Sequence, residues 1–159
     1  MLPTYAVSGS SGWTGGERWT EIVAKPQASS ALEGWGAELI GHTLECLTMS
    51  PLNPDVLYAG TASRGVFKST SGGASWTASA SGMRSSEEIK AIVVNPRQPG
   101  VVYAGSYASG IYTSTNGGSS WALANNGLRN RAIRSLAVSA DGNVVYAGTF
   151  GEGVYRLGR

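Results

Sequence analysis

The chain repeats itself at an interval of 45 residues. The segment Pro51-Leu-Asn-Pro-Asp-Val-Leu-Tyr-Ala-Gly60 returns as Pro96-Arg-Gln-Pro-Gly-Val-Val-Tyr-Ala-Gly105. Self-similarity at a period of about 40–50 residues is typical of stacked or radially arranged units, each of which packs against its neighbours. The sequence therefore predicts a repeat protein, and a specific function must lie where the copies differ.

The tyrosine of the Tyr-Ala-Gly motif marks at least three copies. Tyr58, Tyr103 and Tyr146 are spaced by 45 and 43 residues, and each is followed seven residues later by a glycine. Tyr5 is followed by Gly12 in the same way, so we expect a degenerate fourth copy at the start of the chain. We divide a single predicted domain into 1–44 (degenerate first repeat and irregular linker), 45–89 and 90–133 (repeats), and 134–159 (partial C-terminal repeat).

Each copy contains four segments of strand length that are separated by turn residues. The first is an apolar run such as Cys46–Ser50, the second holds Tyr-Ala-Gly, the third follows the recurring glycine, and the fourth begins at Trp76 or Trp121. The continuous apolar first segment predicts an innermost strand that is covered on both faces. Twenty-three glycines and only 14% charged residues favour strands and tight turns over helices.

Four sequential antiparallel strands form a meander, and a repeated, twisted meander of this kind is most readily a propeller blade. We predict an all-β, β-propeller-like fold with about three to four four-stranded blades per chain. A solenoid is the alternative, although its repeats usually hold fewer strands or contain helices.

The turn before the fourth strand carries a recurring motif. Ser69-Thr-Ser-Gly-Gly-Ala-Ser-Trp76 and Ser114-Thr-Asn-Gly-Gly-Ser-Ser-Trp121 resemble the Asp-box of the bacterial neuraminidase repeat, with Ser71 and Asn116 at the aspartate position. A short polar side chain there accepts backbone N–H bonds, glycine supplies positive φ values, and the aromatic ring covers the hairpin.

With the Tyr-Ala-Gly strands, this motif resembles a wider propeller superfamily over most of residues 45–159. That superfamily includes sialidases, xyloglucan-cleaving glycosidases, the sortilin ectodomain and photosystem II assembly factors. The resemblance implies an architecture and leaves the activity open. It also implies that the motif is structural and lies at the end of the blade opposite to the usual ligand face.

The chain offers few carboxyl groups for catalysis. A glycosidase normally needs two of them facing each other across the substrate, about 5–10 Å apart. We expect Asp55 and Asp141 in turns between the first and second strands, where they have a local role. Glu45, Glu87 and Glu88 are expected to be solvated, and no arginine motif of the sialidase type is present.

The lone His42 and the lone Cys46 are predicted to be structural. His42 has no second His, Cys or nearby carboxylate at metal-ligand spacing. Cys46 cannot form an internal disulfide and lies in an apolar strand, where a thiol is unreactive. We therefore predict no catalytic residue, no metal site and no cofactor.

Charge and hydropathy restrict the classes of partner. A formal net charge of +2 is too weak to indicate nucleic acid or an anionic membrane. No apolar stretch approaches the about 20 residues that a membrane span requires, and the N-terminus lacks a signal pattern. We expect no nucleic-acid partner and no membrane insertion. The compartment stays open, and an extracellular or periplasmic location requires that a signal peptide has been removed.

The link between the second and third strands differs among the copies while its flanks agree. Ala62, Tyr107 and Phe150 are equivalent positions on this link. It emerges at the same end of a blade as the link from the fourth strand to the next copy. Variable aromatic and charged residues on a repeated frame are typical of a recognition surface, although unconstrained loops also vary. The predicted binding residues are Tyr107, Phe150, Arg64, Glu152, Arg129 and Arg131.

The two ends of the chain are complementary in sequence. The last copy holds three strand segments, whereas residues 17–22 resemble a fourth strand. One terminus can complete the blade that the other begins, which removes a sheet edge. We expect copies to assemble, preferably as a six-bladed dimer, and the alternative is a fragment or engineered piece of a larger propeller.

Together these features predict a non-enzymatic binding or scaffold module that recognises a glycan or protein through loops on one face. The alternative is a sialidase- or xyloglucanase-like glycoside hydrolase, or a fragment of one.

Overall fold

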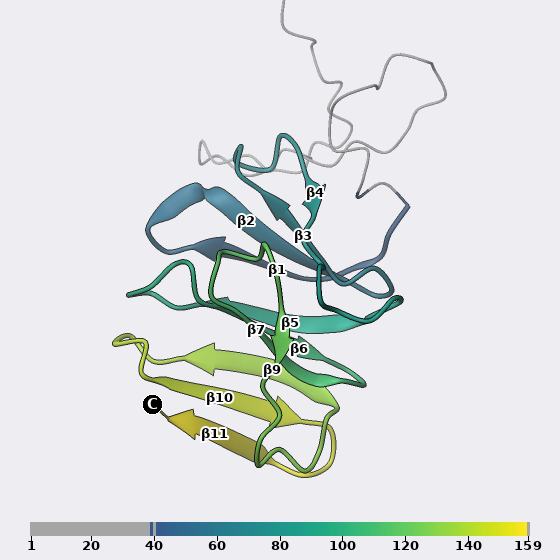
Figure 1. Ribbon diagram of the computed structural model, residues 1–159, viewed down its shortest axis with the longest axis vertical. Coiled ribbons are helices and arrows are strands. Elements are labelled where there is room, and N and C mark those ends of the chain that lie inside the picture. Colours follow the sequence, from purple (N-terminus) through teal and green to yellow (C-terminus); the bar gives the residue numbers. More distant parts are fainter. Residues whose placement is uncertain (1–38, 40, 159) are drawn as a thin grey trace, which may run out of the picture.

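The structure is a computed structural model that describes residue 39 and residues 41–158. Within these residues every regular element is a β-strand, and the strands form three antiparallel sheets (Figure 1). The first sheet contains β1 (Leu44–Ser50), β2 (Asn53–Thr61), β3 (Val66–Ser69) and β4 (Thr77–Ala78). The second contains β5 (Ile89–Val94), β6 (Val102–Ser106), β7 (Gly110–Ser114) and β8 (Ala122–Leu123). The third contains β9 (Ile133–Val138), β10 (Val144–Thr149) and β11 (Val154–Gly158).

Each sheet is a meander in which strands that follow one another in sequence are hydrogen-bonded neighbours. The three sheets are stacked in chain order (Figure 1), and their first strands β1, β5 and β9 contact one another in succession. The fold is therefore all-β and β-propeller-like, as predicted. The degenerate copy around Tyr5 and the strand predicted at 17–22 lie outside the described residues. Nowhere in the described part is there a helix that could cross a membrane.

The core lies between the sheets, because side chains alternate between the two faces of each strand. In β6, Val102 and Ala104 join an apolar cluster with the first sheet, whereas Tyr103 joins a second cluster with the third sheet. We call the side of a sheet that faces the next sheet in sequence its trailing face, and the opposite side its leading face.

The apolar first strands differ in how they are covered. In β5, Ile92 packs in the cluster with the first sheet and Val93 packs against the cluster with the third, so both faces are covered as predicted. In β1, Leu47 is exposed. The prediction is therefore wrong for β1, because no described sheet packs on its leading face.

The turns between the third and fourth strands have the geometry that the motif predicts. The Ser71 hydroxyl accepts the backbone N–H of Ser75 at 2.9 Å, and Asn116 Oδ1 accepts that of Ser120 at 2.9 Å. Both glycines of each Gly-Gly pair have positive φ, between 63° and 90°. Ser71 and Asn116 thus accept the equivalent backbone N–H bond in the two turns.

The two aspartates have different surroundings. Asp55 lies within β2, not in a turn, because β2 already pairs with β1 at Asn53 opposite Ser50. Asp141 does lie in the turn between β9 and β10, as predicted. Hydrogen bonds from the Ser139 hydroxyl and then from Asn143 lower the pKa of Asp141.

Two equivalent tryptophans allow a matched test of the packing between sheets. Trp121 Nε1 donates to the Ser79 carbonyl of the first sheet at 2.7 Å, whereas Trp76 Nε1 is buried without an acceptor among the described residues. We expect Trp121→Phe to lower the free energy of unfolding by about 1–2 kcal/mol, because it leaves a buried carbonyl unpaired. Trp76→Phe breaks no such bond and should cost less in urea denaturation. Equal losses would contradict this account.

Candidate functional site

The links between second and third strands are held by the same backbone hydrogen bond in all three sheets. In each, the first residue of the link donates its backbone N–H to the carbonyl just before the inner strand. These bonds are Ala62 to Thr43 (3.0 Å), Tyr107 to Glu88 (3.0 Å) and Phe150 to Ala132 (2.8 Å). They place the variable residues beside the segments that enter β1, β5 and β9. We call this end of the sheets the link end.

At the link end, Arg134 joins the two predicted aromatic residues. Its guanidinium carbon lies 5.1 Å from the ring centre of Tyr107 and 4.9 Å from that of Phe150, so the cation contacts both rings. All three side chains are exposed, and among the described residues no carboxylate forms an ion pair with Arg134. We call Tyr107, Arg134 and Phe150 the aromatic–arginine surface.

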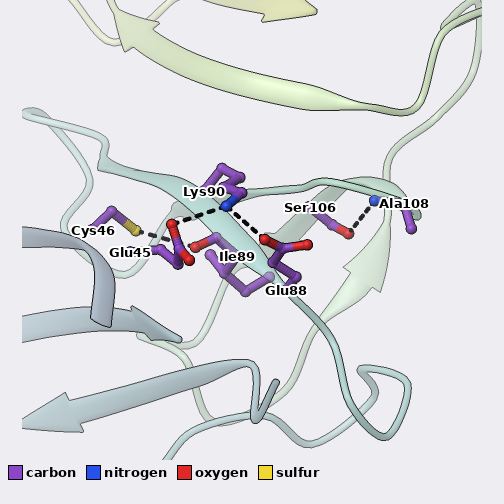
Figure 2. A network of polar contacts seen from close by, with 7 residues as sticks. All are labelled: Glu45, Cys46, Glu88, Ile89, Lys90, Ser106 and Ala108. Carbon is purple, nitrogen blue, oxygen red and sulfur yellow. Dashed lines mark hydrogen bonds and ion pairs between the residues drawn. The ribbon is translucent and has the colours of Figure 1, made fainter. Parts of the chain in front are cut away.

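Lys90 lies beside this surface, but two carboxylates neutralise its charge. Its ammonium pairs with Glu88 and with Glu45 (Figure 2). It also lies 5.9 Å from the ring centre of Tyr107. The hydrogen bonds that Lys90 donates to Glu88 and then to Glu45 raise the pKa of Lys90. Lys90 therefore contributes little free positive charge, in contrast to Arg134.

The other predicted binding residues are exposed around the surface. Arg129 and Arg131 lie on the link that enters β9, which Asn130 ties to the Phe150 carbonyl at 2.8 Å. Glu152 accepts a hydrogen bond from the Tyr155 hydroxyl at 3.3 Å, and Arg64 lies on the corresponding link of the first sheet. The structure thus brings Tyr107 and Phe150 together through Arg134. It records no side-chain contact from Arg64, Arg129, Arg131 or Glu152 to them within the described ranges.

Arg134 was not among the residues predicted from the sequence. Its signal lies in the inner strands, where Glu45, Lys90 and Arg134 occupy the second position of β1, β5 and β9. The copies differ in charge at this position. A comparison confined to the links could not find it.

Glu87 is buried, which corrects the prediction that it is solvated. Its Oε2 accepts hydrogen bonds from the hydroxyls of Ser109 and Tyr112, both at 2.9 Å, and its Oε1 accepts one from Ser106. Ser106 is the last residue of β6, and Ser109 lies on the link that carries Tyr107. Glu87 therefore holds that link in place through three buried hydrogen bonds.

Cys46 lies against the second sheet, where its Sγ donates to the Ile89 carbonyl at 3.7 Å (Figure 2). Burial raises the pKa of the thiol to about 11. At pH 8 almost all of the sulfur is protonated, so we expect a disulfide reagent to react with the folded protein much more slowly than with the chain unfolded in urea. Similar rates for the two states would contradict this.

No protein-family model and no curated protein matches the chain. Solved structures do match. The GH74 enzyme of Niastella koreensis (NkGH74) is similar at a TM-score of 0.60 and 27% identity, over 70% of this chain and 19% of the enzyme. An ancestral GH74 enzyme is similar at a TM-score of 0.57 and 24% identity, over 71% of this chain and 17% of that one. Sqt1 of Chaetomium thermophilum, solved bound to the N-terminus of ribosomal protein L10, is similar at a TM-score of 0.56 and 18% identity, over 72% and 31%.

These proteins share a β-propeller architecture, which agrees with the three stacked meanders of this chain. The chain spans about a fifth of the length of the two GH74 enzymes and about a third of Sqt1. The similarity therefore concerns a part of each neighbour.

Proposed function

We propose that the chain is a non-enzymatic binding module whose ligand meets the aromatic–arginine surface. The observation that carries this is the Arg134 guanidinium, which contacts both the Tyr107 and the Phe150 rings while no described carboxylate pairs with it. Aromatic rings supply flat apolar faces, and a guanidinium supplies directed hydrogen-bond donors. An acidic glycan presents both an apolar sugar face and a carboxylate, so it suits this combination best.

The neighbouring charges favour the same class of ligand. Arg129 and Arg131 are exposed on the adjacent link, and no described carboxylate pairs with them either. Positive side chains around an uncovered contact favour the association of anionic ligands. A protein segment rich in acidic residues is the other ligand that this surface could accept, and Sqt1 is a neighbour that was solved with a peptide segment.

The second candidate is a glycan-acting hydrolase or a part of one, because two of the structural neighbours are GH74 enzymes. Against it, four of the six carboxylate side chains of the described residues are engaged in local contacts. Glu45 and Glu88 face Lys90, Glu87 is enclosed by hydroxyls, and Asp141 caps its own turn. A panel of fluorogenic glycosides separates the two candidates, since hydrolysis that disappears when one carboxylate is replaced would refute a pure binding module.

A glycan array with acidic and neutral oligosaccharides tests the proposed ligand class. We expect the wild-type chain to retain acidic glycans and Arg134→Ala to lose them. Leu52→Ala is the matched control, because Leu52 is an exposed apolar residue in the turn between β1 and β2. Retention of acidic glycans by Arg134→Ala at the wild-type level would refute the proposed surface. Retention of an acidic peptide in place of any glycan would refute the glycan and leave the surface intact.

A further inference from the structure

The two interfaces between neighbouring sheets are built alike. In each, a tyrosine on the trailing face of one sheet packs against the leading face of the next, and this tyrosine is Tyr58 in the first sheet and Tyr103 in the second. They are 1% and 3% exposed. A trailing face of this kind is therefore a surface that a leading face normally covers.

A glycine in each trailing face receives an isoleucine of the next sheet. A Cβ built at Gly60 would lie 2.8 Å from Ile89 Cγ2, and one built at Gly105 would lie 2.5 Å from Ile133 Cγ2. Ile89 and Ile133 are fully buried. The absent side chain thus makes a recess that is specific for the leading strand of the following sheet.

The trailing face of the third sheet has the same features and is open. Tyr146, the equivalent of Tyr58 and Tyr103, is 43% exposed, and Val154 is 72% exposed. A Cβ built at Gly148 would approach only the Ser135 side chain of its own sheet, so no described isoleucine occupies this recess.

The leading face of the first sheet is open along β1. Leu44, Leu47 and Met49 stand where β5 has Ile89, Ile92 and Val94. Leu47 is 57% exposed, whereas Ile92 is 6% exposed. Farther across this leading face, Ala59, Phe67 and Trp76 pack with Leu39 and are buried, so the open part lies along β1. The described residues therefore present an open trailing face and an open first strand, and the first strands β5 and β9 occupy the corresponding place in the two interfaces between sheets.

Polar groups of the first interface between sheets recur on the open trailing face of the third sheet. The Tyr58 hydroxyl and the Lys68 ammonium both donate to the Gly117 carbonyl of the second sheet, at 3.1 and 2.8 Å. Tyr146 and Arg156 repeat this hydroxyl and cation on the open trailing face, where they lie opposite each other in the register of β10 and β11. In the first sheet the residue equivalent to Gly117 is Gly72, which is exposed.

We propose that the trailing face of the third sheet docks the leading face of the first sheet of a second copy of this chain. Leu44 of that copy enters the recess at Gly148, and Tyr146 and Arg156 reach its Gly72 carbonyl. The contact is head-to-tail, so two copies that make it reciprocally cover the open trailing face and the exposed β1 of both chains. This contact is independent of the binding function proposed for the link end.

Light scattering across a range of concentrations tests the contact. We expect the full chain to reach at least twice its mass of 16.4 kDa. Val154→Asp on the trailing face and Leu47→Asp on the leading face should each weaken association by about 30-fold or more, because each places a charge at the centre of the contact. Leu52→Asp is the control that should leave association unchanged, since Leu52 corresponds to the exposed Arg97 in the turn of the second sheet, away from both faces.

Mixing the two variants distinguishes head-to-tail docking from a symmetric contact. The Leu47→Asp chain keeps its trailing face and the Val154→Asp chain keeps its leading face, so the mixture should reach a higher mass than either variant alone. Circular dichroism shows whether each variant is folded. The proposal is overturned by a wild-type mass of one chain at every concentration, by normal association of either variant, or by a mixture that does not exceed its components. If the chain has the mass of one copy and Val154 is protected from solvent, the proposal is also overturned. Residues 1–38 would then be assigned to the trailing face.

Discussion

Replacing Glu87 with alanine should lower the free energy of unfolding by about 3 kcal/mol or more, since it leaves several buried hydroxyls without their acceptor. The hydroxyls of Ser106, Ser109 and Tyr112 all donate to this carboxyl group, and all three residues are buried. The Ser106 hydroxyl also accepts the backbone N–H groups of Ala108 and Ser109, so the link that carries Tyr107 should loosen too. Urea denaturation measures the loss.

Two variants serve as controls for this loss of stability. Glu87→Gln keeps an acceptor oxygen at nearly the same volume and should cost only about 1 kcal/mol. Glu88→Ala removes the neighbouring carboxylate, which pairs with Lys90 at the surface, and should cost less than about 1 kcal/mol. A Glu87→Ala variant as stable as Glu88→Ala would show that the buried network does not hold the link.

The second large effect is expected at Gly60. A Cβ there would lie 2.5 Å from Cys46 Sγ, 2.8 Å from Ile89 Cγ2 and 2.9 Å from the Ile89 carbonyl oxygen. Because one of these atoms is backbone, the second sheet must move away from the first. We expect Gly60→Ala to destabilise the fold by about 2–3 kcal/mol through overpacking, measured by thermal or urea unfolding.

Gly148→Ala is the control for this substitution at the equivalent position of the third sheet. Its Cβ would meet only the Ser135 hydroxyl, which can rotate away. The loss should therefore stay below about 1 kcal/mol for the isolated chain. Equal losses at Gly60 and Gly148 would mean that the penalty arises within one sheet and not at the interface between sheets.

The fold could be predicted from the sequence because each repeat carries its own turn-forming residues. The tyrosine and glycine positions locate the second and third strands, and the Gly-Gly pairs before Trp76 and Trp121 locate the hairpin turns. These are local signals, in which turn chemistry and strand alternation act over a few residues. The limits of β2 were less predictable, because a turn of only two residues brought Asp55 into the strand.

The site was only partly predictable, since its contacts join different repeats. Tyr107 and Phe150 could be chosen because they are variable residues on an otherwise regular link. Arg134 connects them from an inner strand, and the burial of Glu87 depends on three hydroxyls from a later part of the chain. A carboxylate in a polar connection is usually solvated, and nothing in the sequence near Glu87 indicates those partners.

The most direct test of the central claim is calorimetric titration of the retained glycan with the wild-type chain and with Phe150→Ala. Phe150 is exposed, so its loss should leave the unfolding midpoint unchanged. If the aromatic–arginine surface binds the ligand, the dissociation constant should rise at least about tenfold, as for a residue at the centre of a contact. An unchanged dissociation constant would contradict the proposed surface.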